Sequence, residues 1–434
     1  GGEYPAGASH ESAVHWHDCH EHCCTELIMR LSQICIAITQ LARGGGAWSP
    51  LSLWPDGILS PGMWISPRDL TSQWQDYTGT TPVSVPGTVA DSANPVGLAL
   101  DIRAGAPGVL GPELVTNGTF DSGISGWTAG YLSPTLSWDS GNHRIAVTGN
   151  TYCTAVTPFS VTAGKTYLLS ATLAGTDPAI WFGTNGTTTV GVMLHASGQS
   201  VYTAASSGTL YAVIQGRGAN GGTAYFDNIS VKEVPGNHML QSTSSARPLM
   251  SAYDGQTLGP GDTYSSTGYP IFQKYDGVDD GMATAAFTAG DLINGMDCQI
   301  PVRRDSAAAC VAGLYNGIAD ATKFFGMAES ASGSGCVGSG AGTPTVWVDN
   351  AQLTGGTAVT RGTLHTALTV GDYHILEFRG LDLSTWTAAG FGLYTSYVFP
   401  GARGDILLYP STASTADKDA ARQYLATYYG VTLP

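Results

Sequence analysis

The chain has 434 residues, of which 43% are hydrophobic and only 12% are charged, and its formal net charge is −15. A chain this acidic lacks the basic surface that nucleic acids and anionic membrane surfaces attract, so we predict neither as a partner. The 58 glycines show no collagen-like period and favour many short strands joined by tight turns. This composition argues against a mainly helical enzyme and favours β-sandwiches or barrels.

The first 46 residues differ from the rest of the chain and predict a helix. Apolar residues spaced four and three apart form a heptad seam, which comprises Leu27, Leu31, Ile34, Ile38 and Leu41. A glycine run at 44–46 ends the pattern. Leu and Ile mixed at both seam positions favour three or more helices, so we predict a homotrimeric coiled-coil stem. An amphipathic helix packed on its own domain satisfies the same pattern, and the stretch is too short and too polar for membrane insertion.

The same segment carries a cluster of cysteines and histidines whose role the spacing leaves open. Its members are His10, His15, His17, Cys19, His20, His22, Cys23 and Cys24. Thiolates and imidazoles at this density can hold a transition metal, although the spacing matches no zinc finger. Interchain disulfides that anchor the stem are the second interpretation, and they would use Cys19, Cys23, Cys24 and Cys35. Solvated side chains beside a helix start are the third.

Residues 112–234 are predicted to form one all-β unit. Runs rich in Val, Ile, Thr, Tyr and Phe lie at 144–147, 166–173, 179–182, 190–194, 210–214 and 224–231. Gly, Asn and Ser separate these runs, as expected for turns between strands. Their even spacing predicts a two-sheet sandwich.

Residues 235–434 give a second β-rich stretch that closes with one helix. Its strand-like runs lie at 271–275, 298–302, 345–348, 374–379, 391–398 and 405–409. Ser414 and Asp417 form a capping box at the start of the helix, and Gly430 marks its end. The apolar face of this helix is predicted to comprise Ala420, Tyr424, Leu425 and Tyr428.

One resemblance covers the first β unit. The segments Glu-Leu-Val-Thr-Asn-Gly-Thr-Phe-Asp at 113–121, Gly-Trp at 126–127 and Tyr-Phe-Asp-Asn-Ile-Ser-Val at 225–231 bracket both of its ends. This frame resembles that of jelly-roll carbohydrate-binding modules. The resemblance implies a structural calcium held by Asp121 and Asp227, and we expect no required cofactor. Position 121 is an Asp where those modules carry Glu, and both residues also fit strand-end turns.

A second resemblance uses the segments on both sides of that unit. The segments are 62–70, 75–82 and 95–98 before it, and 236–238, 246–248, 275–280 and 404–408 after it. Together they are similar to the concanavalin A-like (laminin-G-like) domains of bacteriophage virion proteins, including tail and head fibres. The resemblance implies a split lectin-like domain, 47–111 and 235–434, with the jelly roll 112–234 inserted in a loop near 105–111. Insertions at exposed loop tips are well tolerated.

Glycan binding would use aromatic rings against sugar faces, with a few polar groups beside them. The candidates are Trp127, Tyr152, Trp181, Tyr202 and Tyr211 in the jelly roll, and Trp347, Tyr394 and Tyr397 in the lectin-like domain. Most tryptophans of a sandwich belong to its core, which is the alternative for each of them. The acidic run at 276–280 fits either a calcium site or a turn.

We predict a mainly β protein with two β-sandwich (jelly-roll) domains, an N-terminal helical stem and one C-terminal helix. No enzyme motif is found, because 164–166 lacks the first glycine of a P-loop and no nucleophile elbow is present. The predicted function is a non-enzymatic, homotrimeric virion protein on the particle surface. It would contact other virion proteins and adsorb to host-surface carbohydrate. The alternatives are a purely structural decoration or tail protein, and a polysaccharide-degrading tailspike.

Overall fold

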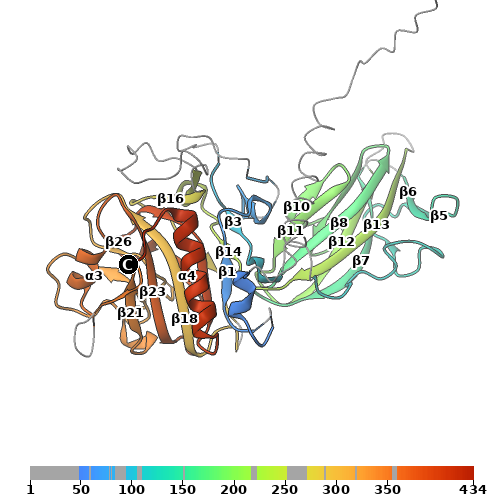
Figure 1. Ribbon diagram of the computed structural model, residues 1–434. Coiled ribbons are helices and arrows are strands. Elements are labelled where there is room, and N and C mark those ends of the chain that lie inside the picture. Colours follow the sequence, from blue (N-terminus) through green and yellow to red (C-terminus); the bar gives the residue numbers. More distant parts are fainter. Residues whose placement is uncertain are drawn as a thin grey trace, which may run out of the picture. The chain divides into compact units, whose positions relative to one another are not determined.

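The computed structural model describes residues 48–434 except 58–59, 78, 80, 84–93, 105–109, 150–151, 217–221, 252–270, 288–289, 318–319 and 354–358 (Figure 1). The predicted stem therefore lies outside the described residues, with its seam (Leu27, Leu31, Ile34, Ile38, Leu41) and its cysteines (Cys19, Cys23, Cys24, Cys35). The described residues are mainly β, as predicted. None of their helices is long and apolar enough to cross a membrane.

Residues 112–234, which we call the inserted sandwich, form two five-stranded antiparallel sheets. The first has the order β10-β9-β12-β7-β4 and the second the order β11-β8-β13-β6-β5. The strands are β4 (Thr128–Ala129), β5 (Thr135–Asp139), β6 (Arg144–Thr148), β7 (Cys153–Val161), β8 (Thr166–Gly175), β9 (Pro178–Gly183), β10 (Thr189–Leu194), β11 (Gly198–Thr203), β12 (Gly208–Gly216) and β13 (Thr223–Val234). Alternate residues of both sheets point inward and form the core, including Phe159, Phe182 and Phe226, and Phe120 and Trp127 join it from outside the strands.

The remaining strands, which we call the flanking sandwich, come from both sides of the inserted sandwich in the sequence. One nine-stranded sheet has the order β15-β16-β27-β18-β23-β21-β22, with β1 paired to β28 and β28 also paired to β18. A five-stranded sheet has the order β2-β3-β14-β17-β24. Strands that precede residue 112 thus pair directly with strands that follow residue 234.

The bounds of these strands are β1 (Met63–Ile65), β2 (Gln73–Trp74), β3 (Leu98–Ala99), β14 (Met239–Leu240), β15 (Leu249–Ser251), β16 (Phe272–Asp276), β17 (Met282–Thr284), β18 (Asn294–Arg304), β21 (Thr345–Val348), β22 (Ala351–Gln352), β23 (Tyr373–Asp382), β24 (Gly390–Phe391), β27 (Pro400–Arg403) and β28 (Ile406–Pro410). Two further pairs are β19 (Cys310–Val311) with β20 (Met327–Ala328), and β25 (Leu393–Tyr394) with β26 (Tyr397–Val398). Short 3-10 turns lie at Pro50–Leu53, Leu70–Ser72, Ile102–Ala104, Ser244–Ala246 and Ser339–Ala341.

One strand prediction is wrong in the flanking sandwich. The run 391–398 was expected to be a single strand, but it is divided among the last residue of β24, and β25 and β26. Tyr394 pairs with Tyr397, so the chain reverses over the two residues between them. Thr395 has a φ of 51°, which is the left-handed conformation that such a reversal requires.

Two α-helices are present among the described residues. Helix α4 (Thr415–Tyr429) begins at Ser414, whose hydroxyl accepts from the Asp417 N–H, and ends at Gly430 in the left-handed conformation. Both predicted caps are therefore confirmed. Helix α3 (Arg361–Ala367) was not predicted. It has only seven residues and is capped by the Thr360 side chain, which accepts from the Thr363 N–H.

Helix α4 is held on the nine-stranded sheet by buried charges, next to β18 and β23 (Figure 1). Lys418 lies 2.7 Å from the Asp297 carboxylate, and Arg422 lies 2.8 Å from the Glu377 carboxylate. Both carboxylates are fully buried. The predicted apolar face is therefore displaced: Leu425 is buried as expected, but its buried neighbours are Ala421, Arg422, Ala426 and Tyr429.

A third buried carboxylate, that of Asp405, connects β1 to α4. It accepts hydrogen bonds from Trp64 Nε1 at 3.0 Å and from the Tyr429 hydroxyl at 3.0 Å, and it pairs with Arg68 at 2.9 Å. A buried charge with this many donors is satisfied, and removing the carboxylate would leave Arg68 uncompensated.

The chain segment that enters the inserted sandwich and the segment that leaves it are joined by hydrogen bonds. The Asp101 N–H donates to His238 Nδ1 at 2.9 Å, and the Asn237 N–H donates to the Asp101 carboxylate at 2.9 Å. Further along, the Gly111 N–H donates to the Glu233 carbonyl at 2.8 Å. The ends of the inserted segment are therefore adjacent, which is the arrangement that tolerated insertions require.

The described cysteines are buried in the two cores. Cys153, Cys298, Cys310 and Cys336 all have free thiols. Burial raises the pKa of the Cys310 thiol to about 11 and that of Cys336 to about 12. Such thiols behave as small apolar side chains and are not reactive.

Candidate functional site

The outward face of the first sheet of the inserted sandwich carries a row of large side chains. Along β9, Ile180 and Phe182 point into the core, whereas Trp181 belongs to a separate cluster on the opposite face. Val213 of β12 lies beside Trp181 in that cluster, since the two are paired residues of neighbouring strands. The alternation of strand side chains thus brings Trp181 to the side of the sheet that faces away from the core.

A pocket of about 350 Å³ lies over this face. It is lined by Tyr131, Tyr152, Thr154, Trp181, Gly186, Thr187, Met193, His195 and Gln215. The volume is near the lower end of the roughly 300–1,000 Å³ that small-molecule sites occupy. Two aromatic candidates from the sequence, Tyr152 and Trp181, are therefore brought into one site.

Thr154 of β7 fixes two of the pocket walls. Its hydroxyl donates to the Gly186 carbonyl at 2.9 Å and accepts from the Tyr131 N–H at 2.9 Å. The Thr154 N–H also donates to the Tyr131 carbonyl at 3.0 Å. One threonine thus holds the loop after β4 and the loop between β9 and β10 against the sheet.

The rim of the pocket presents two half-exposed tyrosine rings. Tyr131 is 49% exposed and Tyr152 is 52% exposed. Tyr152 has a φ of 68°, and the residues that follow Tyr131, Leu132 and Ser133, have φ values of 58° and 43°. Left-handed backbone costs a non-glycine residue about 1–2 kcal/mol. Both rings are therefore held out by strained loops, and strain of this kind concentrates at binding sites.

The floor of the pocket is polar as well as aromatic. Trp181 is only 2% exposed, and its indole N–H is buried without a hydrogen-bond partner. Gln215 supplies an amide beside it. A buried donor without a partner costs about 1–3 kcal/mol.

The pocket carries no formal charge. Its lining contains no Asp, Glu, Lys or Arg. Two carboxylates are needed for the usual mechanism of glycoside cleavage, and neither is present in this lining. The arrangement can bind an uncharged molecule through ring faces and hydrogen bonds.

Three other predicted aromatics of the inserted sandwich lie elsewhere. Trp127 is a core residue, because it is 6% exposed, packs on Phe120 and donates from Nε1 to the Asn117 carbonyl at 3.3 Å. Tyr202 also packs inward, with its ring 5.5 Å from that of Phe182. Tyr211 lies on the outward face near Trp181, but it does not line the pocket.

The aromatic candidates of the flanking sandwich are already engaged by protein groups. The Arg379 guanidinium lies 4.5 Å from the Trp347 ring centre and covers that ring. Tyr394 is buried and donates its hydroxyl proton to the Asp320 carbonyl at 2.7 Å. Tyr397 packs against the same cluster of aromatic side chains as Tyr394. None of these rings lines the pocket over Trp181.

The predicted calcium ligands are engaged by their neighbours. The Asp121 carboxylate accepts from the Thr119 hydroxyl at 2.8 Å, and that of Asp227 accepts from the Asn228 N–H at 2.7 Å. Among the described residues, neither belongs to a group of three potential metal ligands. The observed bonds give no support for the ion, and calcium at this position stays a prediction.

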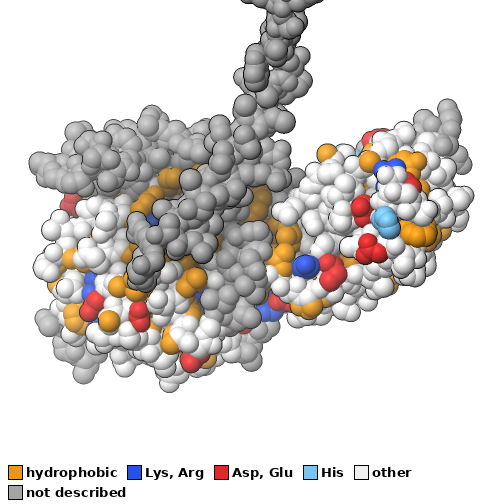
Figure 2. Space-filling view, turned by 45° about the vertical axis from the view of Figure 1, so that its right-hand side comes forward, with side chains coloured by type: hydrophobic (Ala, Val, Ile, Leu, Met, Phe, Trp, Pro, Cys, Tyr) orange, Lys and Arg blue, Asp and Glu red, His pale blue; other side chains and the backbone are white. Residues whose placement is uncertain are grey.

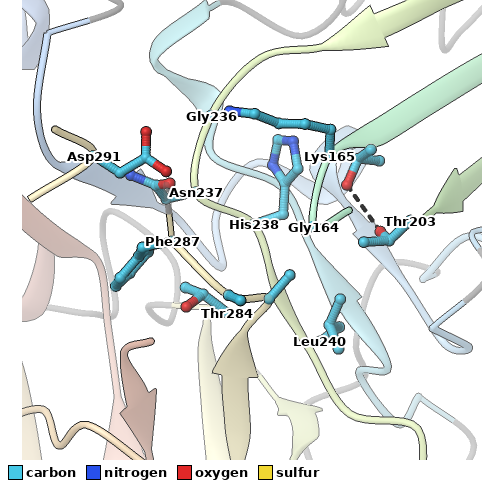
Figure 3. A pocket seen from close by; sticks show the side chains of 13 residues that line it. Gly164, Lys165, Thr203, Gly236, Asn237, His238, Leu240, Thr284, Phe287 and Asp291 are labelled. Atoms are coloured by element: carbon cyan, nitrogen blue, oxygen red, sulfur yellow. Dashed lines mark hydrogen bonds between the residues drawn. The ribbon is translucent and has the colours of Figure 1, made fainter. Parts of the chain in front are cut away.

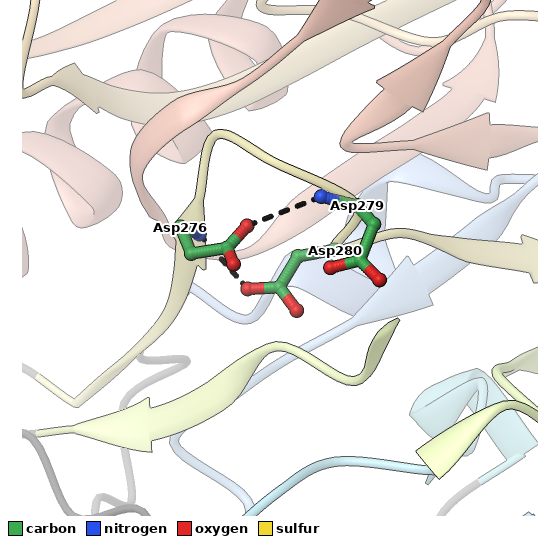
Figure 4. Close-up of side chains that lie close together, drawn as sticks. All are labelled: Asp276, Asp279 and Asp280. Carbon is green, nitrogen blue, oxygen red and sulfur yellow. Dashed lines mark hydrogen bonds between the residues drawn. The ribbon is translucent and has the colours of Figure 1, made fainter. Parts of the chain in front are cut away.

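Three carboxylates do meet in the turn after β16, at Asp276, Asp279 and Asp280 (Figure 4). The Asp276 N–H donates to the Asp280 carboxylate at 2.8 Å, and the Asp276 carboxylate accepts from the Val278 N–H at 2.7 Å. Burial raises the pKa of Asp280 to about 7, and the two neighbouring carboxylates add to this effect. These bonds explain the cluster as a turn between strands.

A second hollow is far smaller, at about 10 Å³ (Figure 3). It is lined by residues around Lys165, Asn237 and His238, next to the hydroxyl pair of Thr166 and Thr203 at 2.8 Å. This volume holds about one water molecule, so it is no ligand site.

Comparisons with known proteins give structural neighbours only. No protein-family model matches the chain, and no curated protein matches it. A family 16 carbohydrate-binding module matches with 19% identity and a TM-score of 0.22, over 27% of this chain and 98% of that one. A CBM4 module matches with 18% identity and a TM-score of 0.23, over 28% and 99%. The CBM22-1–CBM22-2 tandem domain of Paenibacillus barcinonensis Xyn10C matches with 12% identity and a TM-score of 0.25, over 70% and 99%.

The neighbours are carbohydrate-binding modules, but likenesses at these scores establish nothing about a ligand of this chain. Sequence reasoning identified Tyr152 and Trp181 as candidates and missed Tyr131, Thr154 and Gln215. The strained backbone of the loop after β4 gives no sequence signal, since Tyr131 is not flanked by the usual left-handed residues Gly and Asn on its C-terminal side.

Proposed function

We propose that the protein is a carbohydrate-binding protein and that the pocket over Trp181 binds an uncharged glycan. The observation that carries the proposal is the pair of half-exposed rings, Tyr131 and Tyr152, held by strained loops above an uncharged polar floor. Sugars present apolar C–H faces to aromatic rings and hydroxyls to polar groups, and few other ligands need both in one small pocket. A neutral glycan matches the absence of charge in the lining.

A glycan array with the full chain tests this function. We expect binding to neutral glycans, and loss of that binding in the double variant Tyr131→Ala/Tyr152→Ala. Tyr77→Ala serves as the matched control, because Tyr77 is a comparably exposed tyrosine, at 44%, outside the pocket. Retained binding in the double variant, or binding that the control loses equally, would contradict the assignment of the site.

The wider biological role follows from the sequence and is part of the same proposal. The chain acts as a non-enzymatic virion protein of a bacteriophage, a tail or head fibre or a decoration, and it carries the pocket to host-surface carbohydrate. The support is the similarity of the flanking segments to phage virion domains and the Leu/Ile seam at 27–41, which favours a homotrimer. Three pockets on one stem would raise avidity without new contacts.

Mass measurement of the full chain tests the assembly. We expect a trimer, and disruption of it by charged substitutions at Leu31 and Ile38, which lie in the seam. A strict monomer would remove the fibre from the proposal while leaving the pocket untouched. Binding to host cells then separates an adsorption protein from a purely structural decoration, which would contact virion proteins alone.

A further inference from the structure

We propose that the pocket accepts the terminal unit of a glycan chain, or a side branch of one or two units, and excludes the internal part of a long chain. This inference rests on the proposed carbohydrate function and narrows its ligand. The observation behind it is a closed end of the pocket, formed where two walls meet at Thr154.

The walls touch each other at Thr154. The Thr154 hydroxyl lies 2.9 Å from the Gly186 carbonyl and 2.9 Å from the Tyr131 N–H. A Cβ atom placed on Gly186 would lie only 3.4 Å from the Tyr131 nitrogen and 3.2 Å from the Thr154 hydroxyl. Since the backbones come this close, no sugar unit can pass between them.

The loop 184–188 that forms one wall is built to stay in place. The Asn185 side-chain oxygen accepts from the Thr187 N–H at 2.8 Å, from the Thr187 hydroxyl at 2.9 Å and from the Thr188 N–H at 2.8 Å. The Thr184 N–H donates to the Thr188 carbonyl at 3.1 Å, which closes the loop. This is an Asx-type turn, and one side chain organises it.

The same loop lies across the sheet face. A Cβ atom on Gly183 would lie 2.7 Å from the Val213 side chain, so the start of the loop is pressed against β12. Val213 and Thr154 are at most 1% exposed although they belong to the face that points away from the core. An open face would let a long chain cross every strand. Here the loop covers part of that path and leaves a pocket.

Size and charge specify the unit that fits. A volume of about 350 Å³ suits one or two sugar units, and the lining offers no cation for a uronic or sialic acid. A terminal or branch-end neutral sugar meets both conditions. Its exposed end would enter between the Tyr131 and Tyr152 rings toward Trp181.

Calorimetry on the full chain with cello-, xylo- and galacto-oligosaccharides of one to six units tests the inference. For the series that binds, we expect the hexasaccharide to bind within about threefold of the disaccharide, because further units find no contacts. On the parent polysaccharide, sites per unit mass should rise with the number of chain ends after partial cleavage. An affinity that grows roughly tenfold or more from two to six units overturns the inference and leaves the proposed function intact. Failure of every sugar to bind overturns both.

Variants of loop 184–188 test whether this loop causes the expected preference for short oligosaccharides. Asn185→Ala removes the acceptor that organises loop 184–188, and we expect the preference for the hexasaccharide over the disaccharide to rise by about threefold or more. Asn185→Asp keeps an oxygen acceptor and should retain the wild-type selectivity. Asn142→Ala is the matched control, because Asn142 is an exposed asparagine with a side-chain bond to Asp139 outside the pocket. An unchanged length dependence in a folded Asn185→Ala variant overturns the role of the loop.

Discussion

Tyr152 offers a test in which binding and stability should move in opposite directions. Its ring is 52% exposed at the rim of the pocket, and its φ of 68° is unfavourable for a residue with a side chain. Tyr152→Gly removes the ring and also permits the left-handed backbone without strain. A residue kept only for folding would show the reverse, since its loss would lower stability and leave binding unchanged.

The size of the binding effect follows from the exposed ring. An aromatic side chain has roughly 200 Å² of surface, so about 100 Å² of Tyr152 is open to solvent at 52% exposure. A sugar that covers one ring face buries about half of this. At about 25 cal/mol per Å², the loss is roughly 1.3 kcal/mol, or about tenfold in Kd. Relief of the left-handed strain should raise the free energy of unfolding by up to about 1 kcal/mol.

Calorimetry and urea unfolding on the same preparations measure the two effects. Tyr152→Ala should lose the same affinity as Tyr152→Gly, whereas the gain in stability should be confined to the glycine variant. Tyr77→Ala controls for loss of an exposed tyrosine elsewhere. Unchanged affinity in both Tyr152 variants, or affinity that falls only where the protein unfolds, would refute the assignment of this ring to the site.

Three predictions concern stability. Burial raises the pKa of Asp280 to about 7, so the folded state keeps a proton that the unfolded chain releases near pH 4, and the free energy of unfolding falls as pH rises from about 4 to about 7. Asp280→Asn should remove this loss and be more stable than the wild type in urea at pH 8. Burial lowers the pKa of His238, so below about pH 6.5 the unfolded chain binds a proton that the folded state does not, and the free energy of unfolding falls as pH falls. His238→Asn, which keeps an acceptor for the Asp101 N–H, should reduce the change in the urea midpoint between pH 7 and pH 5. Asp405→Ala leaves the partly buried Arg68 guanidinium without its carboxylate partner and should cost about 3–5 kcal/mol by thermal unfolding, whereas an unchanged Tm would disprove the role of this ion pair.

Local patterns predicted most strands of the inserted sandwich but missed a long one, β7. The runs at 166–173 and 224–231 match β8 and β13 because β-branched and aromatic residues dominate them. Strand β7 contains Pro158, which usually argues against a paired strand. Pro158 pairs with Tyr211 on one side, and β4 reaches only Val156 and Ala155 on the other. Strand β4 ends before Pro158, so no strand on that side needs a hydrogen bond from the N–H that proline lacks. Only the strand order of the folded sheet reveals this.

The helix at the C-terminus shows the same limit. Its caps are local, since Ser414 and Gly430 act on backbone groups within one turn, and both were predicted. Its buried face is not local. Arg422 would be placed in solvent by its charge, but the buried Glu377 carboxylate draws it onto the sheet and turns the helix accordingly.

The pocket was only half predictable for a related reason. Trp127 and Trp181 were both candidates from the sequence, and no local pattern marked which of them belongs to the core. Trp181 lies one residue out of phase with the core-facing Ile180 and Phe182, whereas Trp127 packs on Phe120 inside. The walls depend on contacts between Tyr131, Thr154 and Gly186, which are far apart in the chain and carry no shared motif.

The segments that enter and leave the inserted sandwich are hydrogen-bonded to each other, so we predict that each sandwich folds without the other. Asp101 and His238 bond directly, and Gly111 bonds to Glu233, so a linker of about two glycines can replace residues 112–232. The shortened chain loses the cover that Val201 gives to Leu98, a fully buried side chain, and should lose about 1–3 kcal/mol while keeping one cooperative transition. Residues 110–235 alone should fold and keep the sugar affinity of the full chain, because every pocket residue lies within them. A fragment that folds but does not bind would show that the flanking sandwich contributes to the site, which the lining of the pocket gives no reason to expect.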